Sequence, residues 1–137
     1  MMKQLDNRGA AAWEFILVAV PLFVLWFVIF DLGRFAITLQ SLYALANWGA
    51  RAVMINCYTP DAIQKQSPSG CTTNYLSKTQ MQNAAPALYA GGLTPTVSVA
   101  AGAHSLTVTA SESGFKMIMP IWGTTLNAPS VSTSIPF

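Results

Sequence analysis

Glu14 stands out chemically because it is the one charged residue between Gly9 and Phe30. A carboxylate in a membrane helix costs about 2.5–3.5 kcal/mol at the centre and less near an end, so it needs a partner. Cleavage of the chain after Gly9 would supply one, because it creates an α-ammonium group on Ala10, one helical turn from Glu14. The dipole of the new helix would also favour an anion in its first turn. A lone carboxylate at the level of the lipid headgroups is the simpler alternative, and it stays open.

Cys57 and Cys71 are the two cysteines, and they flank a segment rich in Pro, Ser and Gly. If this part of the chain is outside the cytoplasm, an oxidising compartment permits a disulfide between them. Closing a loop of about 15 residues would stabilise the fold by about 3 kcal/mol in the chain-entropy model. Two reduced, buried thiols are the alternative. No C-x-x-C motif is present, which argues against a redox-active pair.

The remaining residues offer little for catalysis, and we expect no enzyme activity, catalytic residue, cofactor, metal or small-molecule substrate. One histidine and two cysteines are too few for a zinc site of the usual kind. His104 falls at an expected hairpin tip with no nucleophile or acid at a suitable spacing, and no nucleotide-binding or hydrolase motif occurs. The net charge of +2 forms no basic stripe, so we expect no nucleic-acid binding.

The elements that position Glu14 begin with an uninterrupted apolar run over residues 15–30. With the four residues from Ala10 to Trp13 added, the run reaches the ~20 residues that a membrane-spanning helix needs. Lys3 and Arg8 precede it, and flanking positive charge favours a cytoplasmic N-terminus. A cleaved secretory signal fits poorly, because the first A-x-A site after the apolar run begins only at Ala44. A plain signal anchor stays open.

After residue 30 the apolar residues recur at steps of three and four up to Val53, which predicts an amphipathic helix. We expect one rod over residues 10–55, roughly 68 Å long at 1.5 Å per residue. Its apolar stripe can pack on the C-terminal part of this chain or on helices of other subunits.

Beyond residue 55 the chain is poor in charge and rich in Ser and Thr, and it predicts a short helix followed by strands. The helix is expected over residues 73–85, capped by Thr73 or Asn74. Alternating apolar residues predict strands around residues 97–99 and 106–110 with a turn at 101–102, then strands at 115–119 and 130–135. The apolar segment 117–122 is either core or a contact patch. The expected fold is α+β, a long helical spine packed on a small four-stranded antiparallel sheet.

The N-terminal motifs resemble a known family. Gly9, the triplet Trp13-Glu14-Phe15, Pro21 within the apolar run and the Asp31-Leu32-Gly33-Arg34 segment are similar to TadE-like minor pseudopilins of the tight-adherence (Flp-type) pilus system. The similarity is strongest over residues 7–55, with a weaker echo over residues 105–120. Trp13 is bulkier than the aliphatic residue usual in the family, and Asp31 stands where Glu is common.

The resemblance implies a pilin-like fold and a function in pilus assembly. A prepilin peptidase would cleave between Gly9 and Ala10, and Glu14, the fifth mature residue, would serve recognition and assembly. Other pilin and pseudopilin subunits and the assembly machinery would be the partners. The chain would divide into a leader (1–9), a transmembrane half-helix (10–32), an amphipathic half-helix (33–55) and an extracytoplasmic α+β domain (56–137).

The implied location is the inner membrane, crossed once, with the C-terminal domain in the periplasm or outside the cell. Two alternatives remain at this point. One is an unprocessed, single-span membrane protein whose domain serves as a periplasmic binding or scaffold module. The other is a soluble domain released near Asn47.

Overall fold

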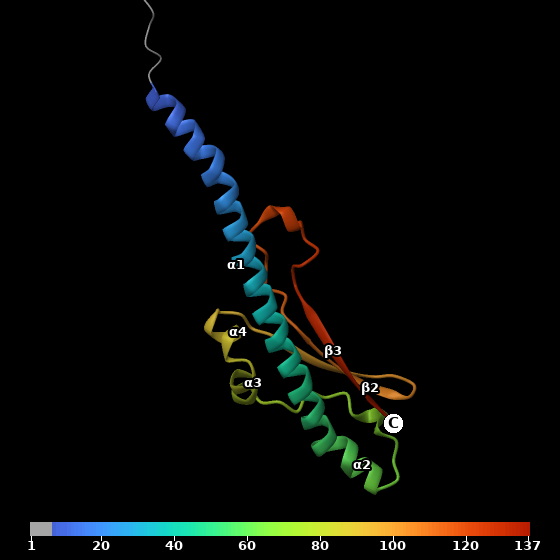
Figure 1. Ribbon diagram of the computed structural model, residues 1–137. Coiled ribbons are helices and arrows are strands. Elements are labelled where there is room, and N and C mark those ends of the chain that lie inside the picture. The colour runs from blue at the N-terminus through green and yellow to red at the C-terminus, as the bar shows by residue number, and fades with distance from the viewer. Residues whose placement is uncertain (1–6) are drawn as a thin grey trace, which may run out of the picture.

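The computed structural model describes residues 7–137, with the side chains of Asn7, Arg8 and Ala10 left out. Most of the expected leader therefore lies outside the described residues. The fold is α+β, as expected: a long N-terminal helix, α1 (Asn7–Val53), carries a small antiparallel sheet and two short helices along its second half (Figure 1). The first half of α1 extends beyond this domain (Figure 1).

The helical rod is longer than the sequence predicts. After α1 the chain continues through a π-helical turn, η1 (Met54–Tyr58), into α2 (Thr59–Ile63), so the helix ends at Ile63 rather than at Ile55. Pro60 does not stop it. It follows the π-helical turn, where the N–H of Thr59 donates to the carbonyl of Met54, five residues earlier.

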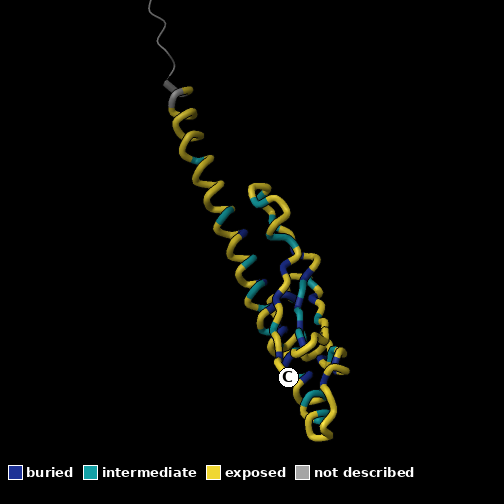
Figure 2. Tube along the Cα trace, turned by 90° about the vertical axis from the view of Figure 1, so that its right-hand side faces the viewer, coloured by how far each residue is buried: buried dark blue, intermediate teal, exposed yellow. Residues whose placement is uncertain are grey.

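The two halves of α1 have different surroundings, as Figure 2 shows by colour. Between Trp13 and Phe30, fourteen large apolar side chains are 44–70% exposed. From Asp31 onward, one face of the helix is buried, and its residues recur at helical spacing. That face comprises Asp31, Thr38, Leu42, Leu45, Ala46, Gly49, Ala50 and Val53.

The sheet has three antiparallel strands in the order β1 (Thr96–Ala101), β2 (Ser105–Ser111) and β3 (Ser130–Pro136). The Ser and Thr residues of β2 alternate with fully buried apolar ones, as a half-buried strand requires. The buried side chains pair across the strands as Val99 with Val108, Leu106 with Ile135, and Ala110 with Val131. Together with the buried face of α1 they form the core of the domain.

The expected fourth strand at residues 115–119 is wrong, since this segment is a loop. The N–H groups of Ile118 and Met119 donate to the carboxylate of Asp31, and that of Met117 donates to Oδ1 of Asn127. Side chains therefore take up the hydrogen bonds that a neighbouring strand would need.

The expected helix over residues 73–85 is also wrong in its bounds. The structure has two shorter helices, α3 (Lys78–Ala84) and α4 (Pro86–Ala90). Asn74 accepts a hydrogen bond from the N–H of Leu76 and forms a local turn instead of a cap. The cap is Ser77, whose side chain accepts from the N–H of Gln80 while that of Gln80 accepts from the N–H of Ser77.

Candidate functional site: the apolar half of α1 and the Asp31 junction

The residues of the predicted processing site all lie near the start of α1. The peptide bond between Gly9 and Ala10 is inside the helix, and Glu14 follows one turn later with its side chain exposed. Within the part of the chain that the structure describes, Glu14 forms no hydrogen bond or ion pair. Its expected partner, an α-ammonium group on Ala10, therefore stays a prediction.

The apolar half of α1 has the length of a membrane span. Residues 11–30 would extend about 30 Å as a helix, which matches the hydrocarbon core of a bilayer. Among the described residues, this is the one helix long and apolar enough to cross a membrane. Only 6% of its most apolar stretch of 18 residues is buried. This exposed, apolar segment is consistent with a single-pass membrane anchor.

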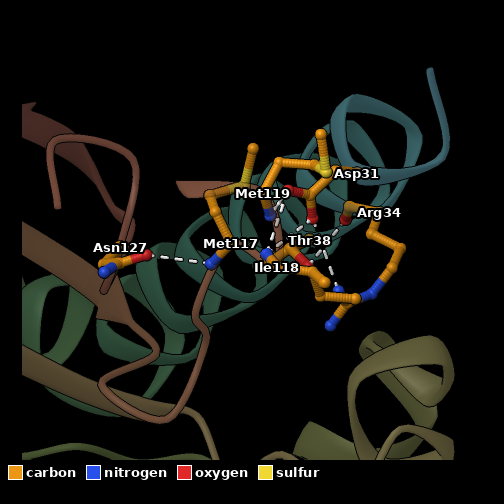
Figure 3. Close-up of polar contacts among 7 residues, drawn as sticks. All are labelled: Asp31, Arg34, Thr38, Met117, Ile118, Met119 and Asn127. Atoms are coloured by element: carbon orange, nitrogen blue, oxygen red, sulfur yellow. Dashed lines mark hydrogen bonds and ion pairs between the residues drawn. The ribbon is translucent and has the colours of Figure 1, made fainter. Parts of the chain in front are cut away.

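A buried carboxylate marks the end of this apolar segment. Asp31 is only 1% exposed, although it lies one residue after Phe30. Its Oδ2 atom accepts hydrogen bonds from the N–H of Ile118 at 3.0 Å and of Met119 at 2.9 Å, and its Oδ1 atom is 3.2 Å from the N of Ile118 (Figure 3). We call this arrangement the Asp31 junction. It joins α1 to a loop 87 residues later in the chain.

Arg34 completes the surroundings of Asp31. Its Nη1 atom lies 3.5 Å from Oδ1 of Asp31, and its guanidinium Cζ lies 5.5 Å from the centre of the Phe115 ring. The Arg34 side chain is 47% exposed, so the ion pair is partly screened by solvent. The two backbone donors, held in a buried site, are therefore the stronger partners of the carboxylate.

The Asp31 junction fixes where the domain sits along α1. A buried carboxylate must have its hydrogen bonds satisfied, and these donors are available only when residues 118–119 lie beside Asp31. The loop is thereby held at the level where the exposed apolar half of α1 ends.

Sequence reasoning missed this junction, although one signal for it was present. Asp31 directly follows an apolar run, so the argument that demands a partner for Glu14 applies to it as well. Arg34, three residues later, was a visible partner. The backbone donors could not have been found, because no residue type or spacing marks a peptide N–H that is 87 residues away.

The predicted disulfide between Cys57 and Cys71 is present, with the two Cα atoms 5.8 Å apart. It ties the π-helical turn η1 to the loop that follows the short 3₁₀ helix η2 (Pro68–Gly70). Oδ2 of Asp61 lies 3.7 Å and 3.5 Å from the two sulfur atoms. Bonded to each other, these sulfurs carry neither a proton nor a thiolate charge. The cluster therefore offers a metal ion a single carboxylate, and it is not a metal site in this form.

A second buried carboxylate, Glu112, lies at the end of β2. It is 2% exposed, and its Oε1 atom accepts a hydrogen bond of 2.8 Å from the N–H of Gly114. Its Oε2 atom is buried without a partner among the described residues. Burial, and then the charge of Glu112, raise the pKa of nearby Tyr89 above its ordinary value. His104 is exposed in the turn between β1 and β2, as the sequence predicts.

Comparison with models of protein families, with curated protein sequences and with solved structures found no match for this chain. The similarity to TadE-like pseudopilins therefore rests on the N-terminal motifs. What the structure adds is an α+β fold, a disulfide and one long apolar helix suited to crossing a membrane.

Proposed function

We propose that this chain is a minor pseudopilin of the tight-adherence type, a structural subunit that a prepilin peptidase cleaves between Gly9 and Ala10. One observation carries the proposal. A single helix has an exposed apolar half with one carboxylate near its start, and a second half that is buried in a small α+β domain. A long helical spine packed on a small sheet is the arrangement expected of a pilin-like subunit.

The position of Glu14 supports a function in assembly. It lies three residues after Ala11, roughly 5 Å along the helix, at the edge of the segment that would span the bilayer. A carboxylate at this depth is unfavourable without a partner. Since the described part of the chain supplies none, the partner would be the α-ammonium group freed by cleavage, on this subunit or on a neighbouring one.

Two features support a cytoplasmic N-terminus and a C-terminal domain outside the cytoplasm. Lys3 and Arg8 precede the apolar run, and positive residues favour the cytoplasmic side. The disulfide between Cys57 and Cys71 requires an oxidising compartment to persist. Both features support a domain in the periplasm or outside the cell.

The packing of the second half of α1 couples the helix mechanically to the domain. The side chains of Leu42, Leu45 and Val53 are fully buried against the domain. A force that draws the helix out of the membrane would therefore carry the domain with it. This coupling is what a subunit needs when it passes from a membrane store into a pilus or its base.

Replacing Glu14 with Ala tests the proposal. We expect the variant to be inserted in the membrane at the level of the unaltered protein, while pilus assembly in the native host is lost. Gln40→Ala is the matched control, because Gln40 is an exposed polar residue on the same helix outside the apolar segment. Electron microscopy of pili, with immunoblots of membrane fractions, measures both outcomes. Unchanged piliation by an inserted Glu14→Ala protein would contradict the proposal and favour an anchored periplasmic module.

A further inference from the structure

The loop of residues 117–122, which the Asp31 junction holds against α1, presents apolar side chains to the outside. Ile118 is 70% exposed and Ile121 is 60% exposed. Met117, Met119 and Trp122 are half-buried in the same loop. Apolar residues grouped on one exposed loop are the kind of surface that contacts a partner or a membrane.

The place of this loop along α1 indicates what covers it. The hydrogen bonds from Ile118 and Met119 to Asp31 put the loop directly beside the end of the exposed apolar segment 11–30. Figure 1 shows it at the end of the domain that points toward the free half of α1. If residues 11–30 occupy the hydrocarbon core, the loop is at the level of the headgroups in the leaflet on the domain side.

The chemistry of the loop fits that level. No charged residue occurs between Lys116 and the end of the chain. Lys116 lies beside the loop in the chain and is exposed, and a cation at this level attracts anionic lipid headgroups.

We propose that residues 117–122 form a second membrane contact, in which Ile118 and Ile121 insert into the interfacial layer of the leaflet where α1 leaves the bilayer. The occupant of the apolar surface is thus phospholipid, continuous with the lipid around residues 11–30. The inference depends on α1 spanning the membrane, but it is independent of leader cleavage and of assembly into a pilus.

The test places a polarity-sensitive fluorophore on single introduced cysteines in the full chain, which has no free cysteine among the described residues. The test position is Ile118→Cys. Ile63→Cys is the matched control, because Ile63 is also an exposed isoleucine (77%) but lies at the far end of the helical rod. Phe23→Cys, in the middle of the apolar segment, reports insertion of α1 itself. The proteins are reconstituted into vesicles of phosphatidylethanolamine and phosphatidylglycerol that carry spin-labelled lipids.

We expect blue-shifted emission at Ile118→Cys and loss of its fluorescence with lipids labelled near the headgroup, whereas Ile63→Cys should show neither. The inference would be overturned if lipids quench the label at Phe23→Cys while the label at Ile118→Cys behaves like the Ile63→Cys control. In that case α1 would still span the membrane. A blue-shifted Ile118→Cys label that lipids do not quench would also overturn it, and would indicate contact with protein. If lipids do not quench the label at Phe23→Cys, α1 does not span the membrane, and the inference that depends on this span fails as well.

Discussion

Two carboxylates on α1, those of Asp31 and Glu14, each need a partner for their charge, but they differ in whether the fold supplies one. Asp31 is buried and accepts hydrogen bonds from two peptide N–H groups of its own chain. Glu14 is exposed on the apolar half of the helix and has no partner within the described residues. Asp31 therefore serves the fold, whereas the proposed partner of Glu14 is an α-ammonium group freed by cleavage.

At the residue scale, we expect Asp31→Ala to destabilise the domain by about 2–4 kcal/mol, because two peptide N–H groups lose a charged acceptor. Arg34→Gln should cost less than about 1 kcal/mol, since it removes only a partly exposed ion pair and a cation–π contact. Hydrogen exchange of the amides of Ile118 and Met119 in detergent micelles provides the local measurement. Equal protection of these amides in Asp31→Ala and in the unaltered protein would show that the junction does not hold the loop.

At the scale of elements, α1 packs very closely on the sheet at one glycine. A Cβ atom at Gly49 would lie 2.9 Å from Cγ1 of Val108 and 3.2 Å from Cγ1 of Val97, while one at Gly33 would meet nothing within 4 Å. Because both glycines are inside the same helix, replacing either with alanine gives the same gain in helix propensity. The two positions differ only in how closely they are packed.

We therefore expect Gly33→Ala to be neutral or to stabilise the protein by up to about 1 kcal/mol, through helix propensity alone. Gly49→Ala should instead destabilise it by about 1 kcal/mol, because overpacking against β-branched side chains outweighs that gain. Thermal unfolding of both variants in the same detergent measures the difference. If the Gly49→Ala variant unfolds at the same temperature as the Gly33→Ala variant, α1 does not pack this closely on the sheet.

Elements with a regular apolar period could be predicted from the sequence, and elements defined by single hydrogen bonds could not. The buried face of α1 follows helical spacing, and residues 106–110 alternate as a strand must. Residues 115–119 look equally like a strand, yet their N–H groups bind Asp31 and Asn127 instead. The true start of α3 depended on the pairing of Ser77 with Gln80, which the sequence contains but which competed with the caps expected at residues 73–74.

The candidate site likewise has some features that could be predicted from the sequence and others that could not. The apolar segment, Glu14 and the two cysteines could be recognised from composition and spacing, and the cysteines are indeed bridged. The Asp31 junction could not, because its donors are backbone groups brought close only by the fold.

At the scale of the whole molecule, the chain is a rod with its domain attached along one half only. The free half has the length and apolarity of a membrane span, and the attached half is locked to the domain by its buried face and by Asp31. We propose that this rod is matured by removal of residues 1–9, which would free an amine at the start of α1 within one turn of Glu14.

The most direct test is the N-terminus of the protein extracted from membranes, determined by intact mass and N-terminal sequencing. We predict a chain that begins at Ala10 in cells with a prepilin peptidase and one that retains residues 1–9 when the peptidase gene is deleted. Retention of residues 1–9 in both strains would contradict the account. It would leave an ordinary membrane anchor, in which Glu14 has no freed amine to bind.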